Sequence, residues 1–211
     1  MNAPGPLYIV AAGTLAAAAY VWWSNSQDYG TDPNATVPLD GSSDWTDSFD
    51  DLGSQVNNLF TSVAGNVSNP NVQAFLAMVR RGEGTTGPNG YRTLYGGGLF
   101  NDYSKHPNVR VTAGGITSTA AGAYQILAGT WGEIAALYGL TDFSPASQDV
   151  AAVALVKRRG ALADVIAGRW QAAIGKCAKE WASLPGSPYG QPTISMQTAL
   201  DTIAANGGVT A

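Results

Sequence analysis

Residues 69–85 read NPNVQAFLAMVRRGEGT, and this stretch carries the clearest structural pattern in the chain. Asn69 is a residue type that caps helices, and Pro70 suits the first helical position. Four apolar side chains then recur at the spacing of one helix face: Val72, Phe75, Leu76 and Val79. Gly82 and Gly84 indicate where the helix stops. The stretch therefore predicts an amphipathic helix whose apolar face packs against a core.

Glu83 continues this apolar face, because positions 72, 76, 79 and 83 lie on the same side of a helix. Its carboxyl is expected on the buried side, at the C-terminal end of the helix. Burial and the negative end of the helix dipole both disfavour the charged form, so a raised pKa is expected. A carboxylic acid that keeps its proton near neutral pH suits a general acid. A turn-capping role, or pairing with Arg80 or Arg81, explains the position equally well.

The other residue types that carry chemistry are scarce. Glu133 and Glu180 are the only further glutamates, and both lie in helical patterns that predict surface or salt-bridge roles. One Cys and one His exclude an intrachain disulfide and a cysteine-based metal cluster. No nucleophile motif accompanies His106, so a structural role is expected for it. No metal site and no cofactor are predicted.

Further along the chain the pattern is that of a compact domain. Residues 85–119 are rich in Gly, Thr and Tyr and contain short β-like runs, YRTLY and VRVT. Helical patterns then follow at 121–128, 130–138, 145–159, 161–167, 170–182 and 194–205. The expected fold class is α+β, mostly helical, with one small β region.

The N-terminal third differs in charge. Residues 1–70 contain seven Asp and no Lys or Arg, whereas residues 71–211 hold eleven basic side chains against eight acidic ones. The excess of basic side chains in residues 71–211 would favour binding of an anionic polymer. Both nucleic acid and the cell wall are anionic polymers. A solvated surface with a chance bias explains the excess as well.

Three segments precede the domain at 69–211. Residues 1–23 predict a membrane anchor helix, because Leu7 to Trp23 is uncharged and would span about 25 Å as a helix. A cleavable signal peptide and a buried soluble helix are the alternatives. Residues 24–43 predict a flexible acidic linker. The acidic arm suits an orientation that places the domain outside the cytoplasm.

Residues 44–66 predict an amphipathic helix, because six apolar residues form a heptad stripe between positions 45 and 63. An isolated helix of this length is marginally stable, so it is expected to dock on something. Its own domain, a second copy of the chain and a virion protein are the three candidate partners for residues 45–63.

Residues 72–208 resemble the phage lambda-type endolysins, which form glycoside hydrolase family 104. The resemblance rests on long collinear runs: AFLAMVRRGEGT around Glu83, GGGLFNDYSKHP at 96–107, STAAGAYQIL at 118–127, LTDFSPASQDVAAVALVKRRGAL at 140–162 and KCAKEWASLPGSPYGQ at 176–191. Residues 1–70 lie outside it.

This resemblance implies a lysozyme-like fold and a lytic transglycosylase. Such an enzyme cleaves the MurNAc–GlcNAc β-1,4 bond of peptidoglycan without water and leaves a 1,6-anhydro sugar. The Glu of the family's S-E-G-T context is the catalytic acid, which implies that role for Glu83. The serine of that context is Gly82 here and an arginine of the cleft is Ala123, so neither side chain's support is expected. The implied glycan-binding residues are Ser118, Thr119, Gly122, Tyr124, Gln125, Tyr189 and Gln191, with core packing as the other reading of Tyr124.

The count of carboxylates agrees with this chemistry. A two-carboxylate hydrolase needs a second Asp or Glu about 5–10 Å from the acid. Asp102 is the nearest in sequence and fits a structural role better. One Glu suffices if the MurNAc 6-hydroxyl of the substrate attacks intramolecularly.

The function predicted for the whole chain is a membrane-tethered phage lytic transglycosylase whose partner is the peptidoglycan glycan strand rather than nucleic acid. Its catalytic domain would lie on the periplasmic side of a bacterial inner membrane or on a virion. It would open the wall at genome entry or at host lysis. A lysozyme-type muramidase and a catalytically inactive wall-binding virion assembly protein are the alternatives.

Overall fold

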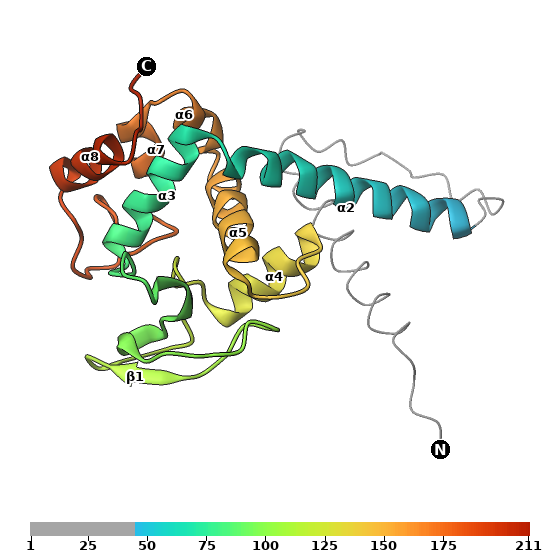
Figure 1. Ribbon diagram of the computed structural model, residues 1–211, viewed down its shortest axis with the longest axis horizontal. Coiled ribbons are helices and arrows are strands. Elements are labelled where there is room, and N and C mark those ends of the chain that lie inside the picture. The colour runs from blue at the N-terminus through green and yellow to red at the C-terminus, as the bar shows by residue number, and fades with distance from the viewer. Residues whose placement is uncertain (1–44) are drawn as a thin grey trace, which may run out of the picture. The chain divides into compact units, whose positions relative to one another are not determined.

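The computed structural model describes residues 45–211, with side chains from residue 54 onward (Figure 1). The predicted anchor at 1–23 and the predicted linker at 24–43 lie outside the described residues. The chain divides into two compact units. Of the described residues, one unit contains 45–61 together with Ala135–Gly139, and the other contains Ser62–Ile134 and Leu140–Ala211.

Helix α2 (Trp45–Val67) confirms the helix predicted at 44–66. Near its C-terminal end Val63 is fully buried, and Ser62 accepts a hydrogen bond from Lys157 Nζ at 2.9 Å. This end of α2 therefore docks on its own domain, which was one of the three expected partners. Binding of a second copy or of a virion protein through residues 45–63 stays a prediction.

Helix α3 (Pro70–Gly82) forms as predicted. The Asn69 side chain accepts hydrogen bonds from the backbone N–H groups of Asn71 and Val72. The apolar face is buried, and α3 packs against α5 (Pro145–Arg158), α6 (Leu162–Ile166) and α8 (Met196–Ala205) (Figure 1). These helices form the core from which the C-terminal end of α3 projects Glu83.

Helix α5 is buried along most of its length. The Ser144 hydroxyl caps its first turn by accepting from the Ser147 N–H, and Pro145 follows. Gln148 is fully buried, and its Nε2 donates to the carbonyls of Tyr91 and Phe143 while its Oε1 accepts from the Ala123 N–H. Because a buried amide needs all its partners, Gln148 fixes the β region against α5.

The β region is smaller than predicted. Strands β1 (Val111–Ala113) and β2 (Ile116–Ser118) form one antiparallel hairpin with Val111 opposite Ser118. The YRTLY run at 91–95 contributes instead to two short 3-10 helices, η1 (Gly90–Arg92) and η2 (Tyr95–Gly97), and to isolated bridges. The mostly helical α+β class is confirmed.

Two helix predictions are wrong: the helix predicted at 121–128 does not form, and the helix predicted at 170–182 is shorter. Residues 121–128 form turns, because Gly122 and Gln125 adopt left-handed φ values of 78° and 46°. Helix α4 (Ala128–Tyr138) begins only after this turn, where Thr119 Oγ1 accepts from the Ala128 N–H. Helix α7 (Trp170–Cys177) ends five residues before the predicted 182, and the chain continues in turns to Leu184.

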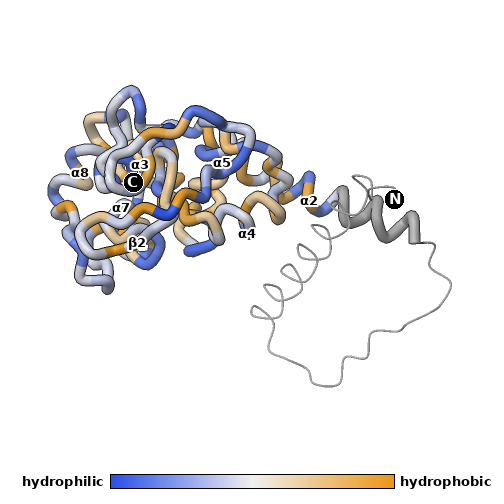
Figure 2. The backbone as a smooth tube through the Cα atoms, turned by 90° about the horizontal axis from the view of Figure 1, so that it is seen from below, coloured by the Kyte–Doolittle hydropathy of each residue, from blue (hydrophilic) through white to orange (hydrophobic). Residues whose placement is uncertain are grey.

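Hydrophobic and hydrophilic stretches alternate along the domain (Figure 2). Within residues 45–211, no helix combines the length and the apolar character that a membrane span requires.

Candidate active site

Glu83 lies at the C-terminal end of α3, where its backbone N–H donates to the Val79 carbonyl at 2.9 Å. Its side chain is half-buried, and its Oε1 accepts a hydrogen bond from Ser183 Oγ at 2.6 Å. Burial raises the pKa of Glu83 above its ordinary value, and the Ser183 hydrogen bond lowers it by less. The predicted direction of the pKa shift is confirmed, with burial as its main cause.

The turn after Glu83 is held by backbone and hydroxyl contacts. Gly84 adopts a φ of 69°, which lets the chain reverse. The buried Thr85 hydroxyl then donates to the Ala123 carbonyl at 2.5 Å. Arg80 turns toward this loop, because its Nη2 donates to the Thr85 carbonyl and its guanidinium stacks over the Tyr91 ring at 4.9 Å. The alternative in which Arg80 pairs with Glu83 is therefore not what the structure shows.

The segment at 118–125 has a shape set by its own polar side chains. Ser118 Oγ accepts from the Ala120 N–H, and Thr119 Oγ1 accepts from the Ala128 N–H. Gln125 Nε2 donates to the carbonyls of Thr93 and Gly122, at 3.1 and 3.0 Å. Because Gln125 is held with a positive φ, this backbone is strained at a place where ligand contacts are expected.

Tyr124 belongs to the core rather than to a surface. It is 2% exposed, and its hydroxyl donates to Asp149 Oδ1 at 2.6 Å, beside the Tyr91 hydroxyl, which donates to the same oxygen at 2.8 Å. Burial and the nearby Asp149 charge raise the pKa of Tyr124 well above its ordinary value. Gly122 is buried as well, against the Gln148 amide. Such burial favours the core-packing reading of Tyr124 over direct contact with a glycan.

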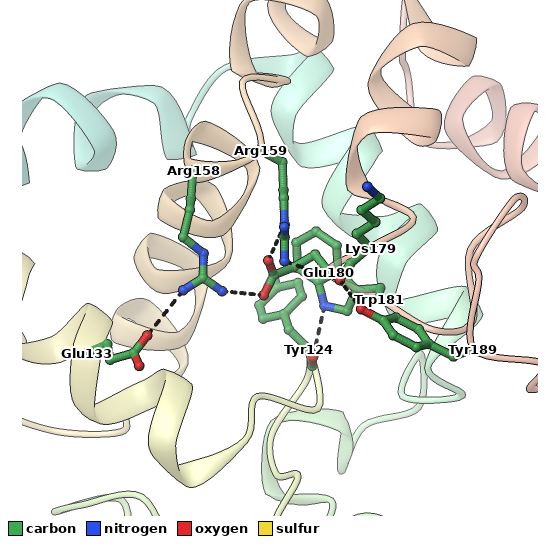
Figure 3. Close-up of polar contacts among 8 residues, drawn as sticks. All are labelled: Tyr124, Glu133, Arg158, Arg159, Lys179, Glu180, Trp181 and Tyr189. Carbon is green, nitrogen blue, oxygen red and sulfur yellow. Dashed lines mark hydrogen bonds and ion pairs between the residues drawn. The ribbon is translucent and has the colours of Figure 1, made fainter. Parts of the chain in front are cut away.

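The third predicted segment, at 189–191, is exposed. Tyr189 is 56% exposed, and its hydroxyl donates to the Lys179 carbonyl at 2.9 Å. Gln191 is exposed too. Trp181 joins this part of the chain to the previous segment, because its Nε1 donates to the Tyr124 carbonyl at 3.1 Å (Figure 3).

Three long-range hydrogen bonds connect the segments that carry the predicted site residues. Thr85 ties the Glu83 turn to Ala123, Ser183 ties Glu83 to the chain after α7, and Trp181 ties that chain to Tyr124. The predicted residues from three distant stretches of sequence therefore belong to connected segments.

The other seven acids of residues 71–211 are all engaged elsewhere. Glu133 pairs with Arg158 at 3.4 Å, while Glu180 pairs with Arg158 at 2.8 Å and with Arg159 at 2.7 Å (Figure 3). Both predicted salt-bridge roles are confirmed. The remaining acids bind hydroxyl, amide, backbone or cationic groups: Asp102, Asp142, Asp149, Asp164 and Asp201.

His106 and Cys177 are both buried. His106 Nε2 lies 2.9 Å from the Ile126 carbonyl, and its Nδ1 accepts from the Asn108 N–H, so the ring braces two loops. Burial raises the pKa of the Cys177 thiol to about 12, which suits a core-filling side chain. Among the side chains described, those of residues 54–211, no three His, Cys, Asp or Glu are grouped as metal ligands would be.

Sequence reasoning did not single out Ser183 or Gln148. Both residues act through contacts across the fold, since Ser183 lies 100 positions from Glu83 and Gln148 lies 25 from Ala123. No local pattern marks either of them, apart from their place inside runs that carry the family resemblance.

Comparison with known proteins gives consistent matches. The sequence profile described as Endolysin matches residues 73–210. The endolysin of Escherichia phage lambda is 45% identical over 126 residues, which are 56% of this chain and 80% of that protein. The endolysin of Escherichia phage P2 is 40% identical over 157 residues, which are 67% of this chain and 95% of that protein.

Two solved structures are similar in fold. The structure of bacteriophage lambda lysozyme complexed with a chitohexasaccharide matches with a TM-score of 0.65 at 40% identity, covering 68% of this chain and 97% of that one. A second structure of lysozyme from bacteriophage lambda matches with a TM-score of 0.60 and the same coverage.

Proposed function

The chain belongs to the Endolysin family, and from this premise we propose that it is a peptidoglycan lytic transglycosylase with Glu83 as its acid and base. The observation that carries the proposal is the contrast among its carboxylates. Glu83 is half-buried with a raised pKa and a hydroxyl as its side-chain partner, whereas the seven other acids of residues 71–211 are engaged in structural contacts.

The reaction needs only one protein carboxyl. Glu83 gives its proton to the glycosidic oxygen, and the bond between that oxygen and MurNAc C1 breaks as the centre becomes oxocarbenium-like. The MurNAc 6-hydroxyl then attacks C1, and its proton passes to the Glu83 carboxylate. A neighbouring hydroxyl has a high effective concentration, so it competes well with water. The products are a free GlcNAc 4-hydroxyl and a 1,6-anhydro MurNAc end.

The surroundings of Glu83 support a glycan substrate. The solved neighbour at 40% identity is complexed with a chitohexasaccharide, a chain of the same β-1,4-linked type. Here the exposed Tyr189 ring offers a face for a sugar, and Ser118, Thr119, Gln125 and Gln191 offer polar groups on segments connected to Glu83. Tyr124 and Gly122 would support this surface from behind.

Product analysis tests the reaction. Purified protein is incubated with peptidoglycan, and the released fragments are weighed by mass spectrometry, for wild type, Glu83→Gln and the matched control Glu133→Gln. We expect anhydro fragments, one water lighter than hydrolysis products, from wild type and Glu133→Gln only. Reducing MurNAc ends would identify a muramidase instead. Binding without any cleavage by wild type would favour an inactive wall-binding protein.

We further propose that residues 7–23 tether the enzyme to a membrane with the catalytic domain on the periplasmic side. The uncharged stretch and the acidic arm behind it support this arrangement. The heptad-patterned helix gives a slight preference to a virion-associated enzyme acting at genome entry over a lysis enzyme. Fractionation of infected cells and purified particles distinguishes them, since detection only in late lysates would rule out the virion setting.

A further inference from the structure

Ser183 makes the side-chain hydrogen bond of Glu83. Its Oγ lies 2.6 Å from Glu83 Oε1 and donates to this oxygen. Among the side chains of residues 54–211, no other one hydrogen-bonds to the Glu83 carboxyl, so Oε2 is left for another partner.

Gly82 makes room for this hydroxyl. A Cβ built on Gly82 would lie 2.6 Å from Ser183 Oγ and 3.2 Å from Ser183 Cβ, closer than side chains pack. Gly82 is helical and its φ is not in the left-handed region, so its backbone does not itself require glycine. A side chain at 82 would therefore force the Ser183 hydroxyl to move.

The chain that carries Ser183 is held firmly on both sides. Before it, Glu180 is clamped by Arg158 and Arg159, and Trp181 donates to the Tyr124 carbonyl (Figure 3). After it, Leu184 is fully buried, and the Ser183 carbonyl itself accepts from the Ile194 N–H at 2.9 Å. A hydroxyl on such an anchored backbone can hold a carboxyl in one orientation.

We propose that Ser183 is a positioning residue that occupies Oε1 of Glu83 and so assigns the transferable proton to Oε2, and that Gly82 in this chain leaves the space that this hydroxyl occupies. The inference rests on the proposed function of Glu83. When the acid is protonated, Ser183 donates to the carbonyl-like Oε1 while Oε2–H faces the glycosidic oxygen. After that proton leaves, Oε1 keeps its hydrogen bond and Oε2 accepts the proton of the MurNAc 6-hydroxyl.

The main test is the pH profile of kcat/KM for Ser183→Ala and Ser183→Thr. We expect Ser183→Ala to lose about tenfold in kcat, the effect of one hydrogen bond to a charged group. Its basic limb should move to higher pH, because the lost hydrogen bond had lowered the pKa of Glu83. Ser183→Thr keeps the hydroxyl, so the basic limb of its pH profile should stay where it is in wild type. If Ser183 had a structural role alone, Ser183→Ala would lower Tm without moving this limb.

A double-mutant cycle tests the role of Gly82. Gly82→Ala should reproduce the loss of rate of Ser183→Ala and its shift of the basic limb of the pH profile. The double variant should lose little more activity than Ser183→Ala alone, because both changes remove the same hydrogen bond, from Ser183 to Glu83. Gly175→Ala, a helical glycine with open space around it, is the matched control and should leave rate and limb unchanged.

The outcomes separate this inference from the proposed function. An unshifted limb and a wild-type rate in Ser183→Ala, with Glu83→Gln inactive, would overturn the positioning role while leaving Glu83 in place. Additive losses in the cycle would overturn the role of Gly82. Activity in Glu83→Gln would instead overturn the proposed function itself.

Discussion

Two glutamates of this domain, Glu83 and Glu180, have different kinds of side-chain partner. Glu180 forms ion pairs with two guanidinium groups, and its side chain is 7% exposed. Glu83 is half-buried and accepts one hydrogen bond from the Ser183 hydroxyl, three residues after Glu180 in the chain. Glu180 therefore cross-links two segments by ion pairs, whereas Glu83 is a candidate general acid.

The difference shows that partner type, more than burial, separates the two roles. Two guanidinium groups bind the Glu180 carboxylate, at 2.8 and 2.7 Å, so Glu180 suits a fixed cross-link between segments. A single hydroxyl partner leaves burial as the dominant influence, and burial raises the pKa of Glu83.

The largest effect is expected for Glu83→Gln. Glutamine keeps the shape but cannot transfer a proton, so peptidoglycan cleavage should fall by at least about a hundredfold. Thermal unfolding should show an intact fold, because no ion pair is lost. A variant that fails to fold would mean that Glu83, like Glu180, is mainly structural.

Glu180→Gln should do the reverse. Removing its charge leaves Arg158 and Arg159 without their shared partner, and about 2 kcal/mol of unfolding free energy should be lost. This lies between the values for exposed and buried ion pairs, since both arginines are partly exposed. Urea unfolding measures the loss, and cleavage per folded molecule should stay within a few-fold. Inactivity at unchanged stability would contradict the contrast.

The pH dependence of stability should also distinguish Glu83. Its pKa is raised in the folded protein, so the unfolded chain loses this proton first as pH rises above the ordinary value of 4.5. Wild type should therefore lose stability relative to Glu83→Gln as the pH rises above about 4.5, and the difference should stay constant at lower pH. Urea titrations across this range measure the difference. A difference that is constant at every pH would mean that Glu83 is not held in a desolvated environment.

The smallest effect is expected for Asp102→Asn. The Asp102 carboxylate binds the Ser104 N–H and hydroxyl within one exposed loop, and these hydrogen bonds lower its pKa. Asparagine can still accept from the Ser104 N–H, and substitutions at exposed positions usually have small effects. The rate of cleavage should therefore stay within about twofold of the wild-type rate. Steady-state rates on peptidoglycan check this. A loss comparable to that of Glu83→Gln would instead support a two-carboxylate hydrolase.

The helix at 70–82 could be predicted because its signals are local. Asn69 caps it, Pro70 begins it and the apolar spacing buries one face, all within a few residues. The segment at 121–128 could not be predicted in the same way. Its small residues suggest a helix, but Gln148 binds the Ala123 N–H from another helix and Gln125 turns left-handed to bind Thr93 and Gly122.

The helical core, the place of Glu83 on the apolar side of its helix and the membership of the chain in its family all follow from the amino-acid sequence, because they depend on spacing and on collinear residues. Which groups surround Glu83 depends on how distant segments pack. Ser183 and Gly82 meet across a separation of about one hundred residues, and no periodicity records a contact that arises when two distant turns pack together.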